Sequence, residues 1–288
     1  MSATPPLVLV IAGFDPSAGA GVAADLKTIA AHNGYGVAAI TALTVQSTKA
    51  VKAVHVTPAA TLRAQLDELL EDVTPQAVKI GMLGNRAVAV AIAEFLDQAK
   101  LPNIVLDPVI QPTSGGPNLL DASGIKFLNE EMVKRSTVVT PNVPEATLLT
   151  GVEIKGISDM EAAARKLVSE HGAKAAVVKG GHMDRSVDVL FDGEEMLTLG
   201  GDNEKFQNTH GSGCTFASAI AVQLAFGRNL REAVMLAKTY VTKAMERGFP
   251  IGKGPGPLDH FYRVHHEPPA RGVHEVPQHG MHPAAEPV

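Results

Sequence analysis

Short apolar runs and amphipathic stretches alternate along most of the chain. The first run, LVLVIAG (7–13), is continuous and ends in glycine, which is typical of a strand buried on both faces. A stretch with helical spacing of its apolar positions follows at roughly 20–32. Because strand and helix patterns then repeat in this order, the sequence predicts a mostly parallel sheet with helices on both faces.

The other elements follow from the same two periodicities. Further strands are predicted at 36–43, 77–81, 103–107, 136–140 and 175–181, and further helices at 58–73, 86–99, 158–172, 212–226 and 230–247. The segment SVDVLFDGEEMLTLG (186–200) differs, because two strand-like runs flank an Asp-Gly pair that is typical of tight hairpin turns. The predicted fold class is therefore α/β, with three layers, a mostly parallel central sheet and an antiparallel hairpin at its edge.

The pattern of elements stops after Tyr262. Residues 263–288 are rich in proline and histidine, have no sustained periodicity and hold five of the eleven histidines. This composition predicts one domain over 1–262 and a disordered tail over 263–288, with weak metal binding by the tail as the alternative.

Composition narrows the class of protein. A chain of 288 residues that is 45% hydrophobic can bury a large core, and its net charge of -5 argues against a non-specific nucleic-acid binder. The single cysteine excludes an internal disulfide and a multi-cysteine zinc site. Apolar runs fall well short of the roughly 20 residues that span a bilayer. We therefore expect a cytoplasmic protein that binds neither nucleic acid nor membranes.

The segment AGFDPSAGAGVAADLKT (12–28) contains a G-x-G-x-x-A match to the dinucleotide fingerprint. Five residues separate Gly13 from Gly19, however, and between Asp25 and Asp67 the chain has no acid that could bind a ribose. The glycines instead predict a tight turn over a small ligand, with Asp25 projecting from the first helix turns. A solvated helix carboxylate is the alternative for Asp25.

TPNVPEATLLTG (140–151) marks the end of a strand and the start of a helix. Asn142 is suited to cap that helix, and Glu145 lies three residues later on the same face. An amide and a carboxylate so placed could hold the waters of a Mg²⁺ ion. Spacing alone slightly favours a capping box, in which the Glu145 side chain returns to the Asn142 backbone.

The segment NTHGSGCTFASAIA (208–221) holds the only cysteine of the chain. Glycines at a helix entrance expose backbone N–H groups, which bind anions and stabilise charge on a transferring phosphoryl group. Cys214 in this field is predicted to have a lowered pKa and to accept a proton from a substrate hydroxyl. The alternatives are a buried cysteine that acts as a small apolar residue, and a hydrolase nucleophile with His210 as its base.

In this order and spacing, the motifs resemble those of the hydroxymethylpyrimidine/phosphomethylpyrimidine kinases, thiamine-biosynthesis members of the ribokinase-like superfamily. The resemblance covers about residues 7–262. Its other parts are ITALTVQST (40–48), KIGMLG (79–84), VLDPV (105–109), VVKGGH (177–182) and GKGPGPLDHF (252–261). The cysteine of G-[ST]-G-C marks this branch, which includes some pyridoxal-phosphorylating enzymes, whereas most ribokinase relatives carry aspartate there. The resemblance implies a ribokinase-like three-layer α/β/α fold.

The resemblance also implies where the pyrimidine binds. The residues that match the family's substrate positions are Gly13, Asp25, Gln46, Met82 and Val109. Gln46 would hold the ring through its amide, which can donate and accept side by side as an aminopyrimidine requires. An ordinary polar residue after a strand is the alternative for Gln46.

Other matched positions imply the nucleotide, the metal and the base. Those that match phosphate-binding positions are Lys179, Lys238 and Asp107, and those that match the magnesium site are Asn142, Glu145 and Asp107. Those of the anion hole are Gly211, Ser212 and Gly213, with Cys214 as the base. A plain surface helix lysine is the alternative for Lys238. The implied cofactors are ATP and Mg²⁺, and relatives of this kind are usually homodimers.

The implied activity is transfer of the ATP γ-phosphoryl group to hydroxymethylpyrimidine and then to its monophosphate. One departure bears on the second step: the loop at 110–116 lacks the lysine that relatives often carry there, which leaves that step open. A pyridoxal or pyridoxine kinase of the same fold is the first alternative. A non-catalytic nucleotide or vitamin sensor is the second.

Overall fold

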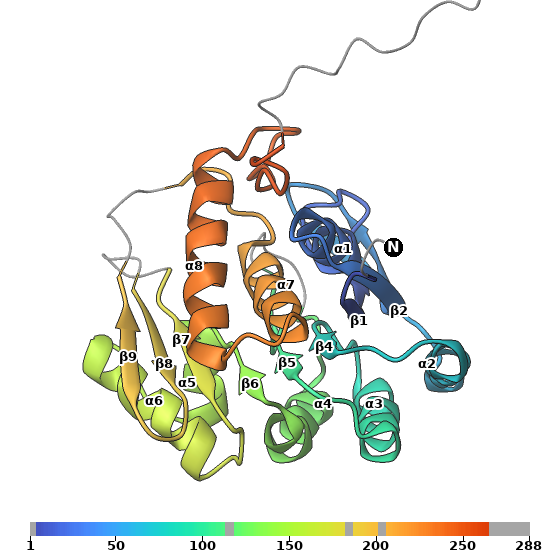
Figure 1. Ribbon diagram of the computed structural model, residues 1–288, viewed down its shortest axis with the longest axis horizontal. Coiled ribbons are helices and arrows are strands. Elements are labelled where there is room, and N and C mark those ends of the chain that lie inside the picture. Colours follow the sequence, from blue (N-terminus) through green and yellow to red (C-terminus); the bar gives the residue numbers. More distant parts are fainter. Residues whose placement is uncertain (1–3, 113–117, 182–186, 201–205, 265–288) are drawn as a thin grey trace, which may run out of the picture.

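One nine-stranded sheet forms the centre of the molecule, in the order β3-β2-β1-β4-β5-β6-β7-β8-β9 (Figure 1). The computed structural model describes residues 4–112, 118–181, 187–200 and 206–264, and the predicted tail from 265 onward lies outside these ranges. The strands are β1 (Leu7–Phe14), β2 (Tyr35–Gln46), β3 (Val51–Val56), β4 (Ala77–Ile80), β5 (Ile104–Leu106), β6 (Val138–Val139), β7 (Ala176–Lys179), β8 (Asp188–Phe191) and β9 (Met196–Leu199). Strands β2, β1, β4, β5, β6 and β7 run parallel, and the antiparallel pairs are β3 with β2, β8 with β7, and β9 with β8.

Helices cover both faces of this sheet. The helices are α1 (Gly21–Ala31), α2 (Ala59–Asp72), α3 (Arg86–Ala99), α4 (Ala122–Phe127), α5 (Val143–Thr150), α6 (Ile157–Ser169), α7 (Ser212–Ala225) and α8 (Leu230–Glu246). Helices α1, α7 and α8 pack on one face, and α2 to α6 pack on the other. Within the described ranges, no helix combines the length and the apolar character that crossing a membrane requires.

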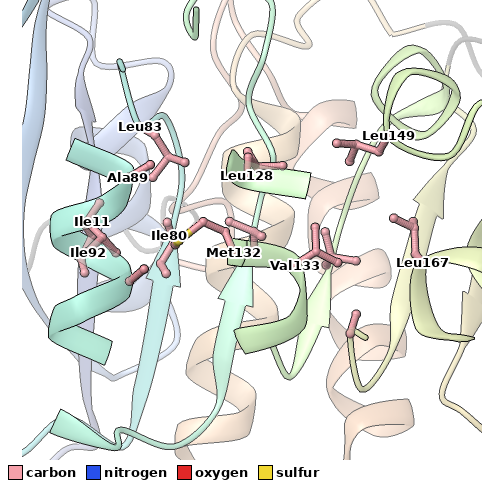
Figure 2. Packing of buried hydrophobic residues seen from close by; sticks show 14 of the residues in the cluster. Ile11, Ile80, Leu83, Ala89, Ile92, Leu128, Met132, Val133, Leu149 and Leu167 are labelled. Carbon is pink, nitrogen blue, oxygen red and sulfur yellow. The ribbon is translucent and has the colours of Figure 1, made fainter. Parts of the chain in front are cut away.

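Alternate residues of the central strands feed two separate cores. In β1, Leu9 and Ile11 pack toward α2 and α3, whereas Val8 and Val10 pack toward α1 and α7. Figure 2 shows the first core, in which Ile80 and Ile92 lie at one end and Leu167 at the other. A strand with apolar layers on both sides needs a continuous apolar run rather than an alternating one, which is why the run at 7–13 marks the centre of the sheet.

The predicted fold class is confirmed, and the structure differs from the sequence prediction in a few individual elements. Two segments were absent from the sequence prediction: β3, and the helical segment that starts with α4 and continues through short π-helical and 3-10 turns to Arg135. The pairing of the long strand β2 with β1 shifts register after Ile40 and ends at Leu43, and β2 pairs with β3 from Ala42 to Gln46. A two-strand extension of this kind has an exposed face, so it lacks the long apolar run that identified the central strands.

Candidate active site

The carboxyl ends of the central strands and the start of α7 enclose one cavity of about 780 Å³. Part of this space is open to solvent, and polar groups from several loops converge on it, which is typical of a small-ligand site. The residues that line it are Ala12, Gly13, Phe14, Asp15, Ala20, Gly21, Thr44, Gln46, Val51, Met82, Asp107, Val109, Gln111, Pro112, Leu119, Asn142, Glu145, Lys179, His210, Gly211, Gly213 and Cys214. Most of the residues singled out from the sequence therefore meet in one place.

The entrance of α7 forms one wall of the cavity. Gly211 precedes the helix with a φ of 82°, a left-handed conformation that favours glycine. A Cβ atom on Gly211 would also collide with the carbonyl oxygen of Gly19. In the described part of the chain, the N–H groups of Gly213 and Cys214 have no backbone partner. They are left to bind an anion, and the dipole of a 14-residue helix adds to their attraction.

Cys214 faces this cavity, but its thiol is less acidic than the sequence predicted. Burial raises the pKa of Cys214 to about 11, and the ammonium of Lys79 opposes that effect only in part. The prediction of a lowered pKa is therefore wrong for the protein without ligands. The physical reason is that the wall around the sulfur is poorly solvated and also contains the carboxyl groups of Asp25 and Asp107.

A lysine–aspartate ion pair lies directly beside the helix entrance. Lys179 Nζ lies 2.9 Å from Asp107 Oδ1, and it would lie 3.0 Å from a Cβ atom on Gly213. Burial lowers the pKa of Lys179, but Asp107 and Glu145 more than reverse this and hold the pKa above its usual value. Lys179 therefore carries a full positive charge next to the exposed N–H groups, as a phosphate-binding lysine must.

Asn142 and Glu145 form the capping box that their spacing favours. The backbone N–H of Glu145 donates to Asn142 Oδ1, and the backbone N–H of Asn142 donates to Glu145 Oε2, both at 2.9 Å. Both side chains also line the cavity, near Asp107. Burial, reinforced by Asp107 and opposed by Lys179, raises the pKa of Glu145 to about 7. A nearby cation would therefore be needed to keep Glu145 fully ionised at neutral pH.

Another part of the cavity lining is more apolar. Met82 and Val109 flank it, and a Cβ atom on Gly13 would lie 2.8 Å from the sulfur of Met82. Gln46 lies at the end of β2, where the hydroxyl of Thr44 donates to its Oε1 atom at 3.1 Å. This contact orients the amide and leaves its NH₂ group and a second lone pair on Oε1 for a ligand. A flat ring with adjacent donor and acceptor atoms fits this part of the cavity.

Three of the residues predicted for the site do not line the cavity. Asp25 is fully buried behind the wall, where it is bonded to Lys79 and Ser218, so its predicted position beside the substrate is wrong for this structure. Lys238 lies on α8 and pairs with Asp188 at 2.8 Å. Ser212 opens α7, and its N–H donates to the carbonyl of Thr209.

The sequence did not indicate Asp15 as a residue of the cavity wall, nor its pairing with His210. The Asp15 carboxylate lies 2.8 Å from His210 Nε2 and accepts hydrogen bonds from Ser17. Burial raises the pKa of Asp15, but the bonds from His210 and Ser17 outweigh it and keep the pKa below its usual value. The pair joins the loop after β1 to the loop before α7. The position of Asp15 directly after a buried strand was the available signal, and the hydrolase alternative for His210 finds no support in this pairing.

The fold and the cavity together define the class of ribokinase-like small-molecule kinases. The model of the phosphomethylpyrimidine kinase family matches residues 15–259. The hydroxymethylpyrimidine/phosphomethylpyrimidine kinase of Bacillus subtilis is 40% identical over 256 residues, which cover 88% of this chain and 94% of that protein. The chain belongs to the phosphomethylpyrimidine kinase family.

The chain is also similar to a longer bifunctional protein and to a solved structure of a kinase with another named substrate. The thiamine biosynthesis bifunctional protein ThiED of Geobacter sulfurreducens is 43% identical over 256 residues, which cover 88% of this chain but only 52% of that longer protein. The structure of the Staphylococcus aureus pyridoxal kinase with AMP-PCP and pyridoxal has a TM-score of 0.82 and 33% identity, over 92% of this chain and 97% of that one. The fold is therefore shared with a protein named as a pyridoxal kinase.

Proposed function

We propose that the protein transfers the γ-phosphoryl group of ATP to 4-amino-5-hydroxymethyl-2-methylpyrimidine, and then phosphorylates the monophosphate to the pyrophosphate, in thiamine biosynthesis. The observation that carries the proposal is that one cavity is lined by Cys214 and by two different groups of residues. One group comprises the α7 entrance and Lys179, which suit phosphates, and the other includes Gln46, which suits an aminopyrimidine. Because the donor is ATP, we place the protein in the cytoplasm, where ATP is made.

The residues of the chain supply position and charge for an in-line transfer. The substrate hydroxyl oxygen attacks the γ-phosphorus, the bond from that phosphorus to ADP breaks, and the hydroxyl proton passes to the thiolate of Cys214. The N–H groups of Gly213 and Cys214 and the ammonium of Lys179 stabilise the negative charge on the phosphoryl oxygens. Gln46 and Met82 hold the ring so that its hydroxymethyl group points toward Cys214.

The cavity also fits a hydrated Mg²⁺ ion that arrives with ATP. The described residues include no cluster of three or more His, Cys, Asp or Glu side chains able to hold an ion directly. Magnesium keeps several of its waters, however, and the oxygens of Asp107, Asn142 and Glu145 line the cavity together. These three residues would hold the ion through its waters, and the ion would neutralise charge on the phosphates.

The first test offers ATP and Mg²⁺ with three separate acceptors: hydroxymethylpyrimidine, its monophosphate and pyridoxal. We expect turnover of both pyrimidines, with kcat/KM for pyridoxal lower by tenfold or more, because only the aminopyrimidine uses both polar atoms of Gln46. Turnover of pyridoxal alone would favour the pyridoxal kinase alternative, which the similarity to the Staphylococcus aureus structure keeps open. Absence of turnover with all three acceptors would instead favour the sensor.

A variant of Gln46 makes the same test specific to the proposed contact. Gln46→Leu keeps the size of the side chain but removes its donor and acceptor. We expect kcat/KM for hydroxymethylpyrimidine to fall about 10- to 100-fold, since each lost bond leaves a ligand group unpaired. Gln65→Leu, at an exposed position of α2, is the matched control. Equal losses for pyrimidine and pyridoxal would contradict selective recognition by Gln46.

We also propose that the protein is a homodimer that uses the outer face of β2. Leu43 and Val45 are 52% and 48% exposed there, on the side opposite to Thr44 and Gln46. Light scattering is expected to give twice the chain mass, and Leu43→Lys with Val45→Lys is expected to give the monomer. Phe226→Lys, at another exposed apolar position, is the control. A wild-type protein that is monomeric at micromolar concentration would refute the dimer.

A further inference from the structure

Behind the wall of the cavity lies an ion pair without any contact with water. Lys79 Nζ lies 2.8 Å from Asp25 Oδ2, and both side chains are 0% exposed. The hydroxyl of Ser218 donates to the other carboxylate oxygen, Asp25 Oδ1, at 2.8 Å. Lys79 lies in β4, Asp25 in α1 and Ser218 in α7, so the pair joins the sheet to two helices. The mechanism described above makes no use of it.

The geometry of the two helices places this pair directly behind Cys214. Ser218 follows Cys214 by four residues in α7, so the two side chains lie on the same face, one turn apart. Asp25 follows Gly21 by the same interval in α1, and the backbone N–H of Gly21 acts on the Cys214 thiol and lowers its pKa. In each helix, the residue at Cys214 (Gly21 in α1, Cys214 itself in α7) is therefore followed one turn later by a residue of the buried cluster, Asp25 in α1 and Ser218 in α7.

Such a pair is not explained by stability. Removing two charges from water carries a large desolvation cost, and a buried ion pair is often no more stabilising than an apolar pair of the same volume. The space is also tight, because a Cβ atom on Gly81 would lie 2.9 Å from Lys79 Nζ. A charged side chain is thus held in a confined region of the sheet, where it acts on the thiol that the proposed mechanism ionises.

We propose that Lys79 and Asp25 are positioning residues that set the ionisation of Cys214, with Lys79 stabilising the thiolate and Asp25 keeping Lys79 charged and in place. Burial lowers the pKa of Lys79, but Asp25 and, to a smaller extent, Cys214 and Asp107 raise it. The pKa of Lys79 therefore lies above its usual value. Lys79 therefore stays protonated while the thiol beside it loses its proton. Neither residue touches the substrate.

Other charged groups around the sulfur also influence the pKa of Cys214. Asp107, at the end of β5, opposes thiolate formation, and Lys179, at the end of β7, is itself influenced by Cys214. These two residues form an ion pair with each other at 2.9 Å, so the charge of Lys179 is shared with Asp107. Lys79 is left as the cation with the greatest influence on the Cys214 thiol.

The single cysteine allows a direct test, because thiol alkylation reports on Cys214 alone. The rate of modification by iodoacetamide is measured by mass spectrometry from pH 7 to 11 in the full-length protein. In Lys79→Met we expect the rate at a given pH below the midpoint to fall about tenfold or more, since one pKa unit changes the thiolate fraction tenfold. A merely structural role would loosen the wall and make alkylation faster, which is the opposite result and would overturn the proposal.

A second variant guards against misfolding. Lys79→Met leaves Asp25 unpaired, whereas Lys79→Met with Asp25→Asn replaces the ion pair by neutral side chains of similar size, and the amide can still accept the bond from Ser218. We expect this double variant to fold, as checked by circular dichroism and thermal melting, and to be alkylated about tenfold more slowly than the wild type. Lys126→Met, at an exposed position of α4, is the matched control. A folded double variant with the wild-type alkylation profile would overturn the proposal.

Kinetic measurements on the same variants test the inference separately from the proposed function. An effect of Lys79 and Asp25 on kcat is expected only if Cys214 is the base, as the proposed function holds. If Cys214 is the base, kcat of the double variant should fall about tenfold at pH 7.5 and recover as the pH rises, while KM for ATP stays within twofold. A slower alkylation with an unchanged kcat profile would support the control of ionisation and refute Cys214 as the base.

Discussion

Replacing Cys214 with alanine is expected to lower kcat by about 10²- to 10⁴-fold, the usual contribution of a general base, with little change in KM for ATP. The thiol lies in the first turn of α7 and lines the cavity, where the proposed reaction needs a group that accepts the proton of the substrate hydroxyl. Alanine keeps the backbone N–H group that faces the cavity, so the anion hole survives. The loss of kcat would then measure the role of the sulfur alone.

The pH profile makes this expectation sharper. Because burial raises the pKa of Cys214 to about 11, the thiolate fraction grows about tenfold per pH unit through the neutral range, and kcat of the wild type should rise with it. Cys214→Asp, which supplies the carboxylate found in most ribokinase relatives, should regain part of the lost activity with a flatter profile. A kcat for Cys214→Ala within threefold of the wild type would remove Cys214 as the base.

Gly211→Ala is expected to destabilise the fold by more than about 2 kcal/mol and to lower kcat by at least about 10²-fold. Two effects add here: a φ of 82° is strained for alanine, and the new Cβ atom would collide with the carbonyl oxygen of Gly19. Relief of that collision has to move the α7 entrance away from the loop after β1. Both walls of the cavity would shift, including the N–H groups proposed to hold the phosphoryl oxygens.

Gly151→Ala is the matched control for this variant. Gly151 ends α5 with a φ of 72°, but nothing lies within 4 Å of the position of its Cβ atom. It should therefore cost only the backbone strain, about 1 kcal/mol, and leave kcat unchanged. Thermal melting and steady-state kinetics on both variants test the difference. Equal effects at the two glycines would show that the contact with Gly19 is unimportant.

How far the sequence predicted the fold depended on how each element is buried. The run at 7–13 and the helix at 86–99 were found from local pattern alone, since two apolar layers or one apolar stripe leave an unmistakable periodicity. The strand β3 was missed because it pairs with the part of β2 that extends beyond the central sheet. There, cross-strand partners decide the structure, and the sequence does not name them.

The site residues also divide into those that local sequence indicates and those that only tertiary contacts place. Gly211, Asn142 and Cys214 were recognised because a helix start needs particular residues at particular positions, and the resemblance to a family assigned their chemistry. Asp25 was recognised too, but its place was wrong, because only packing decides whether a carboxylate faces a cavity or a lysine 54 residues away.

The sequence by itself determined the α/β class, the order of most strands and helices, and the helix entrance at which an anion can bind. Tertiary structure decided which charges surround Cys214 and therefore in which direction its pKa moves. The physical reason is range: helix caps and apolar periodicity act over a few residues, whereas desolvation and charge interactions depend on atoms that only the folded chain brings together. The pairing of Lys79 with Asp25 behind the sulfur belongs wholly to this second kind.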